Sequence, residues 1–266
     1  MSAPFFTNDS LPNQTPSPIL LSPVKTNNAT GNLDQLALMR AADRRLHPSL
    51  TDPSHLVLRS RRIIFSKWIR ELGRENLTVL DVGGRYQPYR PLFGTSVARY
   101  VAVDLIQTGL VTVVADGQAL PFAPESFDLV IATQVMEYLR EPLVAARQIH
   151  DVLKPGGIFL GSFAACAPRF VEEERWRFTR PGLRALLSSF AQVEIVPELY
   201  SAGSVIRTVN LALDAFVHYA PARWLYRRTG CPLLNVLGRG IEKLGLTSND
   251  QFTANYSVRA VKGKRG

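Results

Sequence analysis

The stretch from Thr78 to Asp104 constrains the fold most, because it contains two short apolar runs that end in residues suited to a ligand. The first run surrounds Asp81 and ends at Gly83-Gly84; the second, 100–103, ends at Asp104. Both runs have the length and composition of buried strands. In an open parallel sheet, ligands lie beyond the carboxyl ends of the strands. A glycine turn after one strand and an acid after the next is how such sheets hold a nucleoside, with the acid accepting hydrogen bonds from ribose hydroxyls.

The rest of the chain continues this alternation of strands and helices. Such alternation predicts an α/β fold with a parallel sheet and right-handed crossovers. Ser54 is expected to cap a helix that Gly73 ends, and the Lys154-Pro155-Gly156-Gly157 segment to form a turn before a strand. The predicted strands are 78–83, 100–105, 111–115, 127–133, 157–163, 192–197 and 254–261. The predicted helices are 32–47, 55–72, 141–153 and 181–190.

Composition and charge narrow the class of protein. The chain has 266 residues, 46% of them hydrophobic and 20% charged, which is ordinary for a globular protein with a large core. The net charge is +9, but the basic residues gather before the first strand and near the end of the chain, while the middle is nearly balanced. We therefore expect no nucleic-acid partner and leave peripheral contact with a membrane open.

The two cysteines, Cys166 and Cys231, cannot form a disulfide framework and show no metal spacing, so we expect no metal site. There is no basic segment followed by an apolar run at the N-terminus and no long uncharged stretch, so neither a signal peptide nor a spanning helix is expected. These features predict a cytoplasmic protein, either a monomer or a homodimer.

Five regions follow from the pattern. Residues 1–31 are rich in Pro, Ser, Thr and Asn and are expected to form a disordered tail. N-terminal helices are expected in 32–75, a ligand-binding core in 76–203, and a final strand with a basic tail in 251–266. The segment 204–250 is predicted to be a helical insertion, and its apolar composition fits a lid, a substrate wall or a dimer contact equally well.

Four sequence blocks between about Thr78 and Phe163 carry a family resemblance. They are LDVGG, YVAVDL, ADGQALPFAPESFDLVIATQVMEYL and LKPGGIFLGSF, in that order. Their order and spacing resemble the class I S-adenosylmethionine-dependent methyltransferases, in the branch with LPF…FD and LKPGG signatures. The resemblance implies a Rossmann-like, seven-stranded, mostly parallel sheet with helices on both faces, a helical insertion before the last strand, and an antiparallel last strand. It also implies S-adenosyl-L-methionine as the cofactor.

Carried over residue by residue, the resemblance implies the following cofactor contacts. Asp81, Gly83 and Gly84 would lie under the methionine and ribose, and Asp104, beside Leu105, would accept from both ribose hydroxyls. Asp116, with Gly117 and Gln118, would meet the adenine edge, and Thr133 and Gln134 would face the methionine end. The glycine loop departs from the family pattern, since Arg85 and Gln87 stand where further glycines usually occur. We expect Arg85 to be either a partner of the cofactor carboxylate or a solvated cation.

The acceptor end is less clearly marked. Glu137 is either a base or a helix-start acid, Tyr138 stands where many relatives have His, and Arg177 either orients the substrate or is a surface cation. Methyl transfer from a sulfonium needs no metal and no covalent intermediate, because alignment alone removes much of the barrier. We therefore expect a methyltransferase that acts at oxygen on a small-molecule, glycan or lipid-like acceptor.

Two alternatives to this function stay open, and a third is disfavoured. One is a C- or N-methyltransferase that acts on a quinone-like or natural-product scaffold. Another is a non-catalytic cofactor-binding module, which the altered glycine loop suggests. An NAD-dependent enzyme is disfavoured because the G-x-G-x-x-G spacing is absent.

Overall fold

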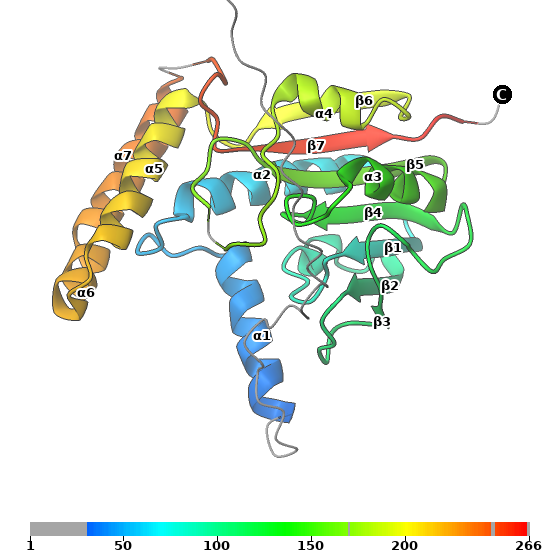
Figure 1. Ribbon diagram of the computed structural model, residues 1–266, viewed down its shortest axis with the longest axis horizontal. Coiled ribbons are helices and arrows are strands. Elements are labelled where there is room, and N and C mark those ends of the chain that lie inside the picture. Colours follow the sequence, from blue (N-terminus) through cyan, green and yellow to red (C-terminus); the bar gives the residue numbers. More distant parts are fainter. Residues whose placement is uncertain (1–30, 170, 246–247, 265–266) are drawn as a thin grey trace, which may run out of the picture.

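The fold is a seven-stranded sheet covered by helices on both faces, with a group of helices projecting from one end (Figure 1). The computed structural model describes residues 31–169, 171–245 and 248–264. The strands lie in the order β3-β2-β1-β4-β5-β7-β6. The strand bounds are β1 Leu77–Val82, β2 Val97–Asp104, β3 Val113–Val114, β4 Phe127–Thr133, β5 Leu153–Ala164, β6 Gln192–Pro197 and β7 Asn255–Val261. The predicted fold is confirmed: β1 to β5 pair in parallel, and β7 is antiparallel to both β5 and β6.

Two apolar layers explain why the central strands consist of nearly continuous apolar residues. On one face, Leu80 and Val130 pack in a cluster that includes Ile149 of α3 (Pro142–Val152) and Leu183 of α4 (Arg180–Leu186). On the other face, Val79 packs in a cluster with aromatic residues of α2 (His55–Leu72). Successive residues of a strand point to opposite faces, so a strand that is covered on both sides needs apolar residues at every position.

Most predicted boundaries are confirmed within two residues, and the exceptions have local causes. Ser54 precedes α2 but makes no side-chain capping bond; its backbone N–H donates to Asp52 Oδ1 at 2.8 Å instead. Gly73 ends α2 in the left-handed conformation, as predicted. At α4, the Thr179 hydroxyl accepts from the Gly182 N–H at 3.2 Å and caps the helix.

The predicted starts of the second and fifth strands and the predicted end of the 181–190 helix are wrong. β2 begins at Val97, because Val97 already pairs with Leu77 of β1, and α4 ends at Leu186. β3 is only two residues long and pairs with β2 at 103–104. β5 begins at Leu153, directly after α3, because Leu153 is fully buried and pairs with Phe127. The glycine turn lies within β5, where Gly156 has a φ of 72°. Helix α1 spans Gly31–Leu46, so Gly31 does not belong to the predicted tail, and residues 1–30 lie outside the described residues.

The segment before the last strand is helical, as predicted, and forms three helices. They are α5 (Ser201–Phe216), α6 (Ala220–Arg228) and α7 (Gly230–Leu244). Figure 1 shows α5 and α7 side by side, extending away from the sheet, with α6 at their far end. Helix α2 contacts both α5 and α7, which places its first turns between the sheet and the projecting helices.

A buried ion pair joins α2 to the end of the sheet. Arg61 donates from Nε to Glu198 Oε1 at 2.7 Å and from Nη2 to Glu198 Oε2 at 2.9 Å, and both residues are almost fully buried. Ser162 of β5 and Ser257 of β7 donate to the same Oε1 at 2.6 and 2.9 Å. Four donor groups thus hold one carboxylate, which is the arrangement that makes a buried charge tolerable.

Removing the cation should therefore destabilise the fold. We expect Arg61→Met to lower the free energy of unfolding by about 3–5 kcal/mol, because Glu198 would stay buried without its partner. Urea unfolding monitored by circular dichroism measures this difference. Arg62→Met is the matched control on the next residue of α2, and should cost roughly 0.5 kcal/mol or less. Equal costs for the two variants would contradict the structural role of the pair.

Candidate cofactor and acceptor site

The turn after β1 brings bare backbone to the point where the order of the strands reverses. Val82 pairs with Val103 of β2 on one side and with Ala132 of β4 on the other. Beyond it, the N–H groups of Gly83 and Gly84 both donate to the Val103 carbonyl, at 2.7 and 3.0 Å. Ligands bind at such a switch point in open α/β sheets.

Both glycines are required by their surroundings. Gly83 has a φ of 76°, and a Cβ there would lie 2.2 Å from a methyl carbon of Val135. A Cβ on Gly84 would lie 2.8 Å from the Asp81 carbonyl oxygen and 2.9 Å from its carboxyl carbon. The turn therefore fits closely against the loop after β4 and against Asp81 itself.

Asp81 lies beneath this turn and is bonded within the protein. Its carboxylate accepts a hydrogen bond of 2.7 Å from the Tyr100 hydroxyl and is 5% exposed. Burial raises the pKa of Asp81 to about 7, although the Tyr100 hydrogen bond acts in the opposite direction. Asp81 is thus close to the predicted cofactor position, and one of its oxygens is already occupied by Tyr100.

Asp104 ends β2 at the same edge and is also buried. Its Oδ1 accepts from the Ile106 N–H at 2.9 Å, and its Oδ2 faces the Nε of Arg85 at 3.2 Å. Arg85 is thus bound to the acid that was predicted to hold the ribose. Leu105, the next residue, is 67% exposed and offers an apolar surface beside the carboxylate.

The loop after β3 holds the third predicted acid in a local turn. Asp116 Oδ1 accepts from the backbone N–H of Gln118 at 2.9 Å, and the Gln118 side-chain amide donates to both carboxylate oxygens. Gln118 Oε1 in turn accepts from the Glu141 N–H at 2.8 Å. Gly117 lies against Val82, since a Cβ there would be 3.1 Å from its methyl carbon. The loop is therefore fixed next to the end of β1.

The end of β4 connects the cofactor side to the buried ion pair. Thr133 is the last residue of β4 and pairs with Ser162 of β5. Gln134 has a φ of 54°, and its side-chain amide donates to the Ser162 hydroxyl at 3.1 Å. Because Ser162 also donates to Glu198, a chain of hydrogen bonds leads from Gln134 to Arg61 on α2.

Glu137 is the buried acid at the predicted acceptor end. It is 2% exposed; its Oε1 accepts from the Ala164 N–H, and its Oε2 has no hydrogen-bond partner among the described residues. Burial raises the pKa of Glu137 to about 7, and the Ala164 bond opposes that change. An acid with one open oxygen and a pKa near neutrality is suited to proton transfer.

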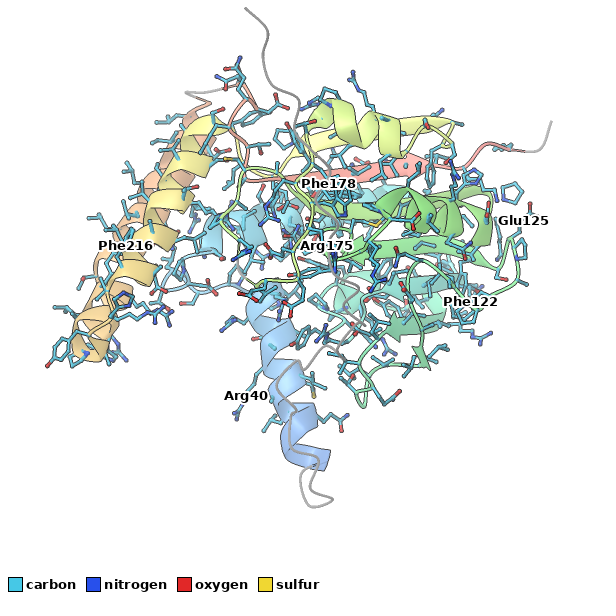
Figure 2. The ribbon with its side chains drawn as sticks, in the orientation of Figure 1. Arg40, Phe122, Glu125, Arg175, Phe178 and Phe216 are labelled. Atoms are coloured by element: carbon cyan, nitrogen blue, oxygen red, sulfur yellow. The ribbon has the colours of Figure 1, made fainter. Side chains whose placement is uncertain are left out.

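Tyr138 and Arg177 lie nearby but use their polar groups to support a loop. The Tyr138 hydroxyl donates to Glu174 Oε1 at 3.2 Å, and Arg177 forms an ion pair with the same carboxylate. Arg177 also donates to the carbonyls of Ala167 and Pro168. These bonds hold the segment between β5 and α4, on which Arg175 and Phe178 are labelled in Figure 2. The N–H of Arg175 donates to the Glu137 carbonyl, which brings this segment next to Glu137.

Sequence reasoning missed four residues of the site. Tyr100, Arg61, Glu198 and Ser162 hold Asp81 and Gln134 in place. Ser162 and Glu198 left a trace in the sequence, since each is a polar residue within or directly after an apolar strand. Arg61 gave no such signal, because it stands among four other arginines and lysines of α2 and its partner is 137 residues away.

Comparisons with known proteins agree with this geometry. Residues 80–161 match the family model described as a methyltransferase domain. An uncharacterized methyltransferase of Mycolicibacterium paratuberculosis is 28% identical over 59% of this chain and 71% of its own length. The arginine-hydroxylase NDUFAF5 of Rattus norvegicus, a mitochondrial protein, is 33% identical over 32% of this chain, and the match spans 27% of that protein's length.

A solved structure is similar over more of the chain. The [4+2]-cyclase SpnF covers 76% of this chain and 81% of its own, with a TM-score of 0.49 and 19% identity. The order of the strands, the glycine turn and the family match together define the core. Residues 80–161 therefore form a methyltransferase domain.

The burial of Glu137 predicts a dependence of stability on pH. Unfolded, Glu137 ionises near 4.5; folded, it keeps its proton to about pH 7. Each pH unit between these values lowers the free energy of unfolding by about 1.4 kcal/mol, because only the unfolded state releases the proton. Between pH 4.5 and 7.5, the free energy of unfolding of the unmodified chain should therefore fall by roughly 3 kcal/mol more than that of the Glu137→Gln variant.

Urea unfolding at both pH values measures this difference without ligand. Glu172→Gln, at an exposed position, is the control and should follow the unmodified chain. If the stability of Glu137→Gln changed with pH as much as that of the unmodified chain, Glu137 would be ionised in the folded chain at pH 7.

Proposed function

We propose that this chain transfers a methyl group from S-adenosyl-L-methionine to a small-molecule, glycan or lipid-like acceptor, and that the acceptor atom is oxygen. One observation carries the proposal: the glycine turn after β1 and the buried carboxylate of Asp104 lie at the same edge of the sheet, where the strand order reverses. A bound nucleoside uses both features. The acid accepts hydrogen bonds from the ribose hydroxyls, and the rest of the nucleoside lies against the backbone of the glycine turn.

The residues present fit that cofactor. The close packing at Gly83 and Gly84 leaves no room for side chains in the turn, and Asp104 Oδ2 retains a lone pair beside its contact with Arg85. We assign Asp104 to the ribose hydroxyls, Leu105 to an apolar contact with the base, and the loop of Asp116, Gly117 and Gln118 to the adenine edge. Thr133 and Gln134, at the end of β4, are assigned to the methionine end.

Asp81 and Arg85 have different roles in this proposal. Asp81 shapes the turn from below, because its carboxylate is bonded to Tyr100. Arg85, which is paired with Asp104, is assigned to the cofactor carboxylate. This role requires its guanidinium to make a second bond beside that to Asp104.

The acceptor chemistry is inferred from Glu137. S-adenosylmethionine supplies an activated methyl group with its own leaving group, so the protein needs only to align the acceptor and remove a proton where the acceptor is a hydroxyl. The Oε2 of Glu137, unpartnered within the described part of the chain, and the raised pKa of this side chain support the role of a base, and this favours oxygen over a carbon or nitrogen acceptor. We place Tyr138 and Arg177 as residues that position the loop, because their polar groups bond within it.

The name of the rat relative supplies a second candidate reaction. That protein is called an arginine-hydroxylase, and it is 33% identical over 32% of this chain. A product analysis by mass spectrometry separates the two reactions, because methylation adds a methylene unit and hydroxylation adds an oxygen atom. We expect the methylene unit, with release of S-adenosylhomocysteine.

Replacing Asp104 should weaken cofactor binding. We expect Asp104→Ala to raise the Kd for S-adenosylmethionine in calorimetry by at least about tenfold, because a hydrogen bond to a charged group contributes roughly 1.5–3 kcal/mol. Asp151→Ala, an exposed acid in the last turn of α3, is the control and should leave the Kd unchanged. Unchanged affinity in Asp104→Ala would remove Asp104 from the binding site.

A general base at Glu137 predicts a pH profile of turnover. With any hydroxylated acceptor that the chain methylates, kcat/KM should rise with pH and level off above about 7, since the ionised form is the active base. Glu137→Gln should lower kcat by about 10²-fold or more and abolish this rise, while the Kd for the cofactor stays the same. Tyr138→Phe is the control and should keep the profile. A Glu137→Gln enzyme with the parental rate and profile would exclude the base.

A further inference from the structure

The projecting helices α5 and α7 have polar interiors and apolar outer surfaces. On α5 the buried side chains include Arg207, Asn210 and Asp214. The apolar side chains of the same helix are exposed: Val205, Val209, Leu213 and Phe216. These four positions are spaced by four, four and three residues, so they form one stripe along the helix. Figure 2 shows Phe216 near the far end of α5.

Helix α7 repeats this inversion. Its buried residues are Cys231, Asn235 and Gly238, and Asn210 of α5 donates to Asn235 Oδ1 at 3.2 Å across the contact. Its outer face is made of apolar side chains that are 51–72% exposed: Leu233, Val236, Leu237 and Leu244. In a helix pair that is surrounded only by water, the apolar stripe of each helix is buried in the contact. The inverted arrangement here indicates that the outer face contacts an apolar environment.

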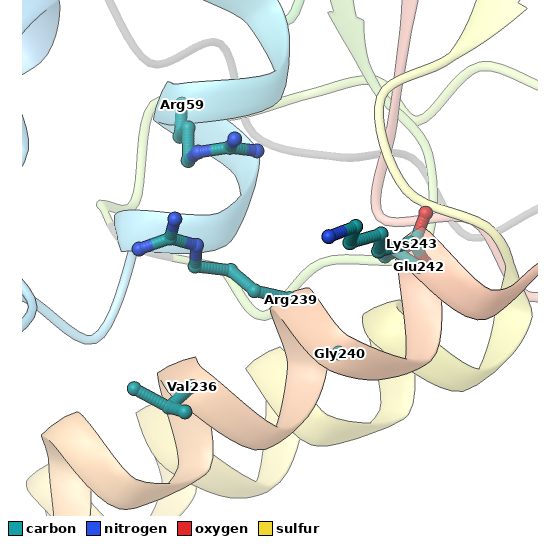
Figure 3. A pocket seen from close by; sticks show the side chains of 6 residues that line it. All are labelled: Arg59, Val236, Arg239, Gly240, Glu242 and Lys243. Atoms are coloured by element: carbon teal, nitrogen blue, oxygen red, sulfur yellow. The ribbon is translucent and has the colours of Figure 1, made fainter.

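A basic depression lies directly beside that outer face. It has a volume of about 580 Å³ and is lined by Arg59, Val236, Arg239, Gly240, Glu242 and Lys243. Figure 3 shows the side chains of Arg59, Arg239 and Lys243 converging from α2 and α7. Among the described residues, none of these three cations has an ion-pair partner within 4 Å. Burial and the charge of Arg239 both lower the pKa of Arg59, so the depression is a place where an anion is favoured.

The far end of the helices has the composition of a membrane interface. Tyr219 is 72% exposed and Trp224 is 57% exposed. The guanidinium of Arg228 lies 4.5 Å from the centre of the Trp224 ring. Aromatic rings with a polar edge, next to long basic side chains, are typical of residues at the level of lipid headgroups.

We propose that the outer face of α7 and the tip formed by α6 dock on a membrane surface that contains anionic lipids, with Arg59, Arg239 and Lys243 over the headgroup phosphates. Charge favours this occupant over a second copy of the chain. Residues 201–245 contain six arginines and lysines against two carboxylates, so two copies of this surface would bring like charges together. No helix in the described part of the chain is long and apolar enough to span a bilayer, so the contact is peripheral.

Vesicle flotation with the purified full-length chain tests the proposal. We expect the chain to float with vesicles of phosphatidylcholine and phosphatidylglycerol, and at least tenfold less with phosphatidylcholine alone. Two variants separate the two contributions: Leu233→Ser with Leu237→Ser should abolish flotation, and Arg239→Glu with Lys243→Glu should reduce it to the level seen with neutral vesicles. Tryptophan emission should shift to the blue on anionic vesicles, and Trp224→Phe should remove this shift.

A matched control keeps the test specific. Leu143 of α3 and Arg184 of α4 are an exposed leucine and an exposed arginine on the opposite part of the fold, and Leu143→Ser with Arg184→Glu should float like the unmodified chain. Circular dichroism melting confirms that each variant is folded. The proposal is overturned if the full chain ignores anionic vesicles, if folded Leu233→Ser/Leu237→Ser variants still float, or if these substitutions instead dissociate a dimer in ultracentrifugation. Flotation requires neither cofactor nor turnover, so its failure leaves the proposed methyl transfer untouched, and the reverse also holds.

Discussion

The buried carboxylate of Glu198 makes the contacts on which the arrangement of the proposed acceptor side depends. It follows β6, is held by Arg61 of α2, and accepts from serines of β5 and β7, so one buried charge fixes a helix and three strands to one another. The same Ser162 connects this centre to Gln134 at the end of β4. Because a buried charge is tolerated only when its partners are in place, the ion pair sets the position of α2. Helix α2 in turn contacts α5 and α7, so the site and the projecting helices share one anchor.

In the proposed function, cofactor binding and chemistry belong to two differently built halves of the strand edge. The cofactor side, around Gly83 and Asp104, is made from backbone and short acids at strand ends, which gives it little freedom to move. The acceptor side, around Glu137, is enclosed by the segment between β5 and α4, whose shape depends on side chains such as Arg177. We expect variation in that segment to change the acceptor without disturbing the sheet, because loops on a rigid core tolerate change.

The sequence predicted the sheet well because its strands are covered on both faces and therefore appear as short apolar runs between glycines and acids. The same logic located Asp81, Asp104 and the glycine turn, since strand ends are visible in the sequence. It could not show that Tyr100 bonds Asp81, that Arg85 bonds Asp104, or that Arg61 meets Glu198, because those contacts join residues that are distant in sequence. Ser54 does not cap α2 for a local reason, since its φ of −91° and ψ of 5° are not the extended conformation of a capping residue. The division into five regions and the roles of the site residues stay predictions.

The central claim is that a nucleoside lies across the strand ends, against the glycine turn and on Asp104. A crystal structure of the full chain with S-adenosylhomocysteine tests it most directly. We predict that the ribose hydroxyls lie within hydrogen-bond distance of Asp104, that the adenine lies beside the loop of Asp116, and that the sulfur is directed toward the segment that contains Glu137. A ligand bound away from the carboxyl ends of β1 and β2, or one that leaves Asp104 bonded to Arg85 alone, would contradict it.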